Sequence, residues 1–266
     1  MRLALALCAL AFPAVAEGRL PSDCLALSQG EARIVHVSLR PDEVRIRYLD
    51  HASFAIETPN LMAVTDYTGA LGDPAVVPDV VTMNNAHDSH YTSHPDPRIP
   101  LILKGWPDED GPAALDLDLG EMRLRNVTSD LRGPFGEGAL QDGNSIFIFE
   151  AAGLCIGHLS HLHQILTPAQ RAAIGLLDVV MVPVDGAFTM SVAAMAEEVR
   201  RFHPRIVLPM HWFSEEGLAL FLAAMQEDHQ IILSDSPQIT LSRETLPTKP
   251  EVIVLVPRLF LAGEER

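Results

Sequence analysis

Strand-like and helix-like segments alternate in the second half of the chain, and this alternation limits the possible folds more than any other feature of the sequence. Residues 179–184 and 205–210 are apolar runs of strand length, residues 191–202 have the pattern of an amphipathic helix, and residues 214–226 are typical of another. A shorter helix is expected over residues 167–177, because threonine is a good N-cap and the proline that follows suits the first helical position. Strands that alternate with helices pair in parallel, with the helices packed outside. This half therefore predicts a sheet covered by helices.

The first half consists mainly of short segments rich in β-branched residues. Strands are expected over residues 33–39, 44–49, 53–57, 61–65 and 79–82, separated by turn-forming proline, aspartate and asparagine. This order predicts an antiparallel meander, with proline-rich loops over residues 67–78 and 94–112. Further strands are expected over residues 121–126, 145–150 and 154–158, and residues 231–233 and 251–255 would complete the second sheet. The fold class is therefore α/β, with two mixed β-sheets sandwiched between helices.

The first residues have the organisation of a secretory signal peptide. Arg2 supplies a positive charge, residues 3–15 are almost wholly apolar, and Ala14-Val15-Ala16 is a small-x-small cleavage pattern. The apolar run is shorter than the ~20 residues that a membrane span needs. We therefore expect residues 1–16 to be removed, and residues 17–266 to form a single exported domain, in the bacterial periplasm, with no membrane span after cleavage.

The charge balance restricts the partners of the protein. The chain has 19 Lys and Arg against 35 Asp and Glu, a formal net charge of -16. This excess of acids argues against nucleic acid and anionic membrane surfaces as partners, and favours a small substrate that is neutral or cationic. The sequence has no Gly-x-Ser-x-Gly elbow, no phosphate-binding glycine loop and no Cys-x-x-Cys pair. The oligomeric state is left open.

Two cysteines remain after removal of the leader. An exported compartment would allow Cys24 and Cys155 to form a disulfide, which would fix the N-terminal end of the mature chain to the core. Alternatively, Cys155 is a small buried hydrophobic residue within its apolar run.

The histidines are concentrated at the ends of predicted strands. Eight of the eleven follow or terminate such a strand, namely His51, His87, His90, His94, His158, His161, His163 and His211. Strand ends hold the backbone rigidly while side chains converge from several directions. Several neutral imidazoles in one apolar cleft need a common cation or individual hydrogen-bond partners. A shared metal site is the simplest explanation.

Six segments in a fixed order also carry a resemblance. They are residues 49–58, Val64-Thr65-Asp66, residues 83–94, Gly157-His158-Leu159-Ser160-His161-Leu162-His163, residues 183–190 and Leu208-Pro209-Met210-His211. The set resembles the metallo-β-lactamase-fold superfamily, and most closely its branch of small zinc-dependent hydrolases that includes lactonase-like proteins. The resemblance implies an αββα sandwich with its metal centre along one edge, between the two sheets.

Residue by residue, the resemblance implies a partly altered ligand set. In the family's first motif, His-x-His-x-Asp-His, His87 and His90 keep two ligand positions, whereas Asn85 replaces the first histidine and Ser89 the aspartate. Ser129 stands near the next histidine position, His161 at the bridging aspartate, and His211 keeps the last ligand position. The expected metal ligands are therefore some three or all four of His87, His90, His161 and His211. One Zn²⁺ is expected, with iron or manganese as alternatives.

Ser89 cannot orient a water molecule or take its proton as the family's aspartate does. Asp185 and His163 are the candidate bases, and Asp185 is also a candidate replacement ligand. The accessory positions are His51, Asp66, Asp88, His94 and His158. His51 either braces the first strand pair or supports a ligand, and Asp66 either anchors a ligand or forms a turn. Asp88 and His94 are surface residues or replacement ligands, and His158 is expected to be structural.

Two functions follow from this set. The leading hypothesis is an exported hydrolase of a small ester, lactone or amide that uses a metal-bound water. The alternative is a degenerate member of the fold that binds a metal or small ligand in the periplasm without turnover.

Overall fold

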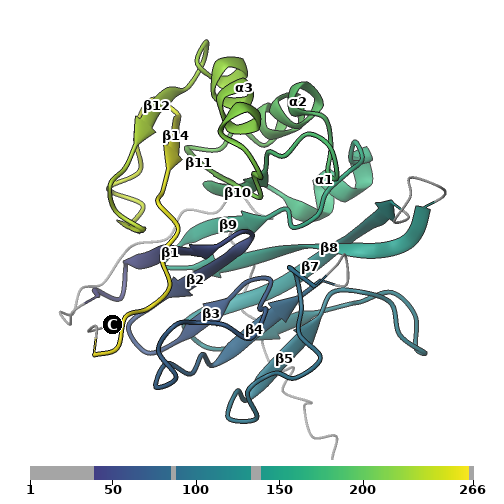
Figure 1. Ribbon diagram of the computed structural model, residues 1–266, viewed down its shortest axis with the longest axis vertical. Coiled ribbons are helices and arrows are strands. Elements are labelled where there is room, and N and C mark those ends of the chain that lie inside the picture. Colours follow the sequence, from purple (N-terminus) through teal and green to yellow (C-terminus); the bar gives the residue numbers. More distant parts are fainter. Residues whose placement is uncertain (1–38, 85–87, 133–138, 264–266) are drawn as a thin grey trace, which may run out of the picture.

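The computed structural model describes residues 39–84, 88–132 and 139–263, which form two mixed β-sheets packed face to face (Figure 1). The first sheet has six strands in the order β13 (Gln238–Leu241), β1 (Val44–Asp50), β2 (Ser53–Glu57), β3 (Met62–Val64), β4 (Val80–Met83) and β5 (Leu101–Lys104). Its first four strands pair antiparallel, and β3, β4 and β5 pair in parallel.

The second sheet has eight strands. Their order is β12 (Gln230–Leu233), β14 (Glu251–Val254), β11 (Ile206–Met210), β10 (Val179–Pro183), β9 (Leu154–His158), β8 (Ala139–Ala151), β7 (Met122–Arg132) and β6 (Asp116–Asp118). Strands β9, β10, β11, β14 and β12 are parallel, as the alternation of strands and helices predicts. Strands β6 to β9 are antiparallel.

Three helices cover the outer face of the eight-stranded sheet: α1 (Pro168–Ile174), α2 (Val192–Phe202) and α3 (Glu215–Met225). Each begins at a side-chain cap, and α1 has the complete capping box of Thr167 and Gln170. Their buried faces meet the apolar side chains of β10 and β11, so the strand residues point alternately to the helices and to the other sheet.

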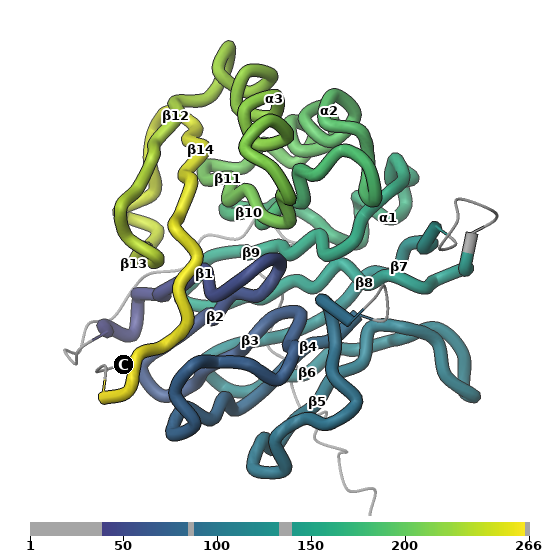
Figure 2. The backbone as a smooth tube through the Cα atoms, viewed as in Figure 1, coloured from purple at the N-terminus to yellow at the C-terminus, as the bar shows by residue number. Residues whose placement is uncertain are grey.

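The main core lies between the sheets, where β1 and β2 pack against β8, β9, β10 and β11. The outer face of the six-stranded sheet is covered by loops and by the segment after β14, which runs past β1 (Figure 2). There the backbone N–H of Phe260 donates to the carbonyl of Leu71 at 2.9 Å. The predicted sandwich is confirmed, with the described helices all on the side of the eight-stranded sheet.

Several predicted elements differ from the structure. The antiparallel meander ends at β3, because the long loop after β3 returns the chain so that β4 pairs in parallel with it. Strand β5 lies within the predicted loop 94–112, where prolines flank a run of only four strand residues. The segment between β12 and β14 contributes β13 to the other sheet. Residues 33–38 of the first predicted strand lie outside the described residues.

Cys155 is a disulfide-bonded, buried residue of β9, and Cys24 of the predicted pair lies outside the described residues. Among the described residues, we find no helix long and apolar enough to cross a membrane.

Candidate metal centre

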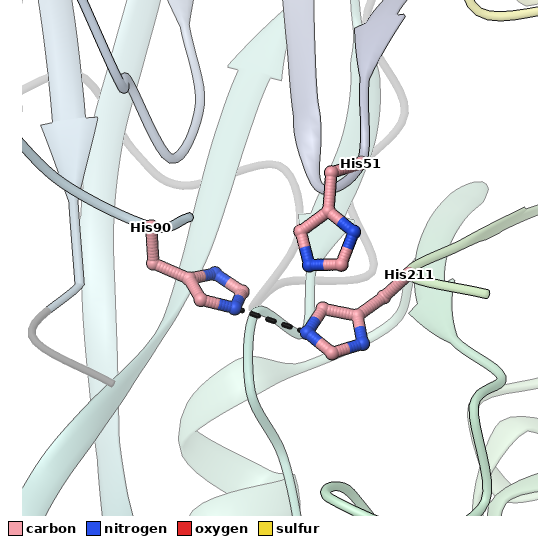
Figure 3. A group of neighbouring side chains, drawn as sticks. All are labelled: His51, His90 and His211. Carbon is pink, nitrogen blue, oxygen red and sulfur yellow. Dashed lines mark hydrogen bonds between the residues drawn. The ribbon is translucent and has the colours of Figure 1, made fainter. Parts of the chain in front are cut away.

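Three histidines from separate parts of the chain converge between the ends of the two sheets (Figure 3). His51 lies in the turn between β1 and β2, His90 in the loop after β4, and His211 directly after β11. Each offers one ring nitrogen, and these three atoms lie within 4.8 Å of one another. His90 and His211 are fully buried and His51 is half-buried. This is a geometry in which three imidazoles can hold one metal ion.

His161 lies against the same group. Its ring centroid is 5.2 Å from that of His90 and 5.2 Å from that of His211. Its backbone N–H donates to Asn144 Oδ1 at 2.9 Å, and Asn144 Nδ2 donates to Ser129 Oγ at 2.9 Å. Strands β7 and β8 thus hold the segment that carries His161. The structure therefore brings together three of the four predicted ligands, and His87, the fourth, lies outside the described residues.

A buried carboxylate orients His90. Asp66 follows β3, and its Oδ2 atom lies 2.6 Å from His90 Nδ1. Neither side chain is exposed. The same carboxylate oxygen accepts a 2.8 Å hydrogen bond from Ser160 Oγ. Burial raises the pKa of Asp66, and the nearby His158 and the Ser160 hydroxyl oppose that rise. Because Nδ1 faces the carboxylate, His90 Nε2 is directed toward the other histidines.

Asn84 connects this carboxylate to the second sheet. Its side-chain amide donates to Asp66 Oδ1 at 3.5 Å and to the carbonyl of Ser145 at 3.1 Å, and also contacts Ser160 Oγ. Its Oδ1 accepts from the backbone N–H of Ser145 at 3.0 Å. The end of β4 is therefore fixed to β8 beside the histidines.

A second carboxylate orients His211. Asp185, which follows β10, accepts from His211 Nδ1 at 3.1 Å, and its side chain is 1% exposed. Its oxygens also accept hydrogen bonds from the Thr189 hydroxyl and from the backbone N–H groups of Ala187, Phe188 and Thr189. Burial alone would raise the pKa of Asp185, but these hydrogen bonds, led by that from His211, bring it below its ordinary value. Asp185 is thus an anionic partner that fixes His211.

The Nε2 atoms of His90 and His211 face each other at 3.1 Å. Two neutral imidazoles whose Nδ1 protons point at carboxylates have no proton to place between their Nε2 atoms. The pair therefore needs one additional proton, or a metal ion in its place. At Zn–N distances of about 2.0–2.1 Å, two ligands of a tetrahedral site lie about 3.3 Å apart, close to the observed separation. The residues present therefore fit a metal ion.

The backbone around the centre is strained. Non-glycine residues with left-handed φ include His51 at 41°, Asp66 at 40°, Ser160 at 47° and His211 at 59°. Such residues cost about 1–3 kcal/mol each and persist where the surroundings enforce them. All four carry or orient an imidazole of the centre, so the strain is concentrated where the histidines must converge.

His158 has a structural environment. It is fully buried at the end of β9, its Nε2 lies 2.8 Å from the carbonyl oxygen of Ala52, and burial lowers its pKa. It therefore links β9 to the turn that follows His51 and is not among the converging rings.

The other predicted positions are spread around the centre. Ser89 is half-buried, Asp88 and His94 are exposed, and Asn85 lies outside the described residues. His163 is half-buried, and burial together with the nearby Arg132 lowers its pKa. Sequence reasoning did not identify Asn84, Asn144 or Ser160 as part of the site. Only Asn84 had a usable pattern, a polar residue directly after a buried strand.

Comparisons with known proteins agree with this fold. A model of the β-lactamase superfamily domain matches residues 45–211. A Thermotoga maritima protein described as a putative zinc-dependent hydrolase of the metallo-β-lactamase superfamily is 24% identical, with a TM-score of 0.55 over 80% of this chain and 98% of that one. A protein of Veillonella parvula described as a possible metal-dependent hydrolase is 11% identical, with a TM-score of 0.54 over 74% and 98%. A metallo-hydrolase of Ignicoccus hospitalis is 13% identical, with a TM-score of 0.52 over 75% and 99%.

At these identities the solved structures are evidence of a shared fold. No curated protein matches the chain. The family model spans more than half of the sequence, from the second residue of β1 to His211, and includes every histidine of the centre. The chain therefore belongs to the β-lactamase superfamily domain family, as its ordered motifs predict.

Proposed function

We propose that this protein is a metal-dependent hydrolase of a small, neutral ester, lactone or amide, with one zinc ion held by His51, His90 and His211. The observation that carries the proposal is the opposed pair of Nε2 atoms, 3.1 Å apart, in rings whose Nδ1 atoms face Asp66 and Asp185. Such carboxylate–histidine pairs fix the tautomer of a metal ligand and increase its basicity. His161 is the remaining imidazole in ring contact with the centre.

The number of bound imidazoles decides the chemistry. Three histidine ligands leave a position for substrate, whereas four complete a closed tetrahedron. When bound, the ion would supply a Lewis acid that polarises a carbonyl group and acidifies a water molecule near neutral pH. Asp66 and Asp185 hold the two imidazoles in place, and the apolar core beneath the centre excludes bulk water from its inner side.

His163 is the candidate base that remains once Asp185 is assigned to His211. Asp185 is occupied by His211, Thr189 and three backbone N–H groups, so its role is to position His211. His163 has a lowered pKa because of burial and the nearby Arg132, so its imidazole is neutral near pH 7 and able to accept a proton. We expect His163→Gln to lower kcat while metal content is unchanged.

A binding protein without turnover is the second candidate. It is favoured by the fact that both carboxylates described at the centre, Asp66 and Asp185, are engaged with histidines, while Ser89 stands where the resemblance implies an acid. Under this hypothesis the same histidines hold a metal, with His161 as the fourth ligand, and no substrate position remains.

The deciding experiment is a panel of uncharged esters, lactones and amides, assayed with the purified protein after addition of Zn²⁺, Mn²⁺ or Fe²⁺. A hydrolase gives a metal-dependent rate on at least one class, and His90→Ala loses it. Stoichiometric metal binding without a rate on any class would select the binding function. Absence of metal binding would refute both.

Export to the periplasm is a separate part of the proposal. It is supported by the charged start, the apolar run and the small-x-small pattern before Glu17. N-terminal sequencing of protein recovered from the periplasm should begin at Glu17. An intact Met1 on cytoplasmic protein would contradict it.

A further inference from the structure

Two exposed phenylalanines lie next to the histidine centre. Phe188 is 60% exposed and Phe213 is 62% exposed, and they are the only aromatic members among the exposed large hydrophobic residues in the described part of the chain. Their ring centroids are 5.5 Å apart at an interplanar angle of 74°. Rings at this distance and angle contact each other edge to face and leave their remaining faces exposed to solvent.

This aromatic pair adjoins the centre through Phe213. The centroid of this ring is 5.2 Å from that of His51 and 5.3 Å from that of His211. A molecule whose reacting group reaches the histidines therefore places its neighbouring substituent beside Phe213, with Phe188 on the outer side.

Phe188 is exposed on a firmly held loop. Its backbone N–H donates to Asp185 Oδ2 at 2.6 Å, and the N–H of Ala187 donates to the same oxygen at 2.9 Å. The carbonyl of Ala187 accepts from Arg132 at 3.1 Å, and the backbone N–H of Met190 donates to Leu162 at 3.1 Å. The loop thus presents the ring to solvent in a fixed position, although exposure of an aromatic face to water is unfavourable.

Phe213 is fixed as well. It lies between His211, whose backbone N–H donates to the carbonyl of His51 at 2.8 Å, and Ser214, whose hydroxyl caps α3 by accepting from Gly217. Neither ring fills the core. A pair of preorganised exposed aromatic faces beside a reactive centre is suited to bind an apolar group.

We propose that Phe188 and Phe213 form an aromatic subsite that binds an uncharged aromatic substituent of the substrate next to the scissile carbonyl. This inference rests on the proposed function and narrows its substrate class. A cationic substituent is disfavoured because the Arg132 guanidinium binds the residue before Phe188. The preferred substrates are therefore esters or amides of arylacetic or benzoic type.

Binding is tested first, without turnover. Acetophenone and acetone are neutral carbonyl probes with no leaving group, and their Kd values can be measured by NMR titration of zinc-loaded and zinc-free protein. We expect wild-type protein to bind acetophenone more tightly than acetone, and Phe188→Ala and Phe213→Ala each to weaken acetophenone binding about fivefold. The matched control is Leu233→Ala on β12. The Leu233 side chain is apolar, 73% exposed and at a sheet edge, and its loss should leave the Kd of acetophenone unchanged.

Kinetics with methyl phenylacetate and methyl acetate give the second readout. Phe188→Ala should raise KM for methyl phenylacetate about fivefold at unchanged kcat, with little change for methyl acetate. Zinc content of both variants should equal that of the wild type. If Phe188→Ala retains wild-type acetophenone binding, the subsite is refuted even when hydrolysis is observed.

The two proposals fail in different ways. Loss of acetophenone binding in both variants supports the subsite, and if the wild type also hydrolyses no ester, lactone or amide, the hydrolase is refuted while the subsite stands. A different outcome is that Phe213→Ala loses zinc while Phe188→Ala binds acetophenone as the wild type does. Phe213 would then merely cover the metal-binding histidines, and the subsite would be overturned.

Discussion

The backbone N–H of His211 donates a 2.8 Å hydrogen bond to the carbonyl oxygen of His51. This bond joins the β1–β2 turn of one sheet to the end of β11 in the other, and the two imidazole centroids lie 4.1 Å apart. Both residues have left-handed φ. The centre is therefore assembled where the two sheets meet, and it exists only in the folded chain.

The carboxylate of Asp185 should tune metal affinity through His211. Asp185→Asn keeps an oxygen for the backbone N–H groups but removes the charge that faces His211 Nδ1. We expect Zn²⁺ affinity to fall about 10- to 100-fold with the fold retained. Competition with a chromogenic chelator measures the Zn²⁺ affinity. The control is Asp118→Asn, which changes an exposed aspartate. Equal affinity in wild type and Asp185→Asn would show that the carboxylate does not act on the metal.

Metal binding should release a proton. His90 Nε2 and His211 Nε2 lie 3.1 Å apart, and a metal ion bound between them would displace a proton shared by the two rings. We expect about one proton per Zn²⁺ near pH 7. Calorimetric titrations in buffers of different ionisation enthalpy give this number. A heat that is independent of the buffer would rule out the shared proton.

Ser89 stands where the resemblance implies an acid, and it is half-buried in the loop that carries His90. Ser89→Asp should raise Zn²⁺ affinity or the hydrolytic rate, because it returns a carboxylate to that position. The neighbouring Asp88, which is exposed, provides the control Asp88→Ala, expected to be neutral. If Ser89→Asp alters neither quantity, the alignment of this loop with the family motif is wrong.

The cysteine of β9 should be linked to the N-terminal end of the mature chain. Cys155 is disulfide-bonded, and Cys24 is the only other cysteine after residue 16. Peptide mapping without reduction should find Cys24 joined to Cys155, and Cys155→Ser should lower the free energy of unfolding by about 2–4 kcal/mol. Separate, unlinked peptides would refute the pairing.

Local sequence patterns were sufficient to predict most of the helices and strands. The capping threonine and proline of α1, the apolar run of β10 and the alternation in β1 and β2 each match elements close to their predicted bounds. Strands β5, β6 and β13 were missed because each has only three or four residues, and β13 in addition pairs with the distant strand β1. Such short runs leave little periodicity to detect.

Part of the site could also be predicted from local sequence patterns. His90, His161 and His211 were placed because histidines at strand ends are visible in the sequence, and these three converge. His51 was considered only a brace or a supporting residue, whereas its ring nitrogen lies within 4.8 Å of those of His90 and His211. Asn84, Asn144 and Ser160 act through partners far away in the chain, and nothing in their neighbouring residues predicts those contacts.

The metal content of the purified protein tests the central claim most directly. After removal of metals by a chelator and addition of excess Zn²⁺ followed by desalting, elemental analysis should find about one zinc per chain in the wild type. His90→Ala and His211→Ala should retain almost none, and His94→Ala, which changes an exposed histidine, should retain the wild-type amount. Zinc retained equally by wild type and His90→Ala, or only traces of any transition metal in the wild type, would contradict a metal centre at these histidines.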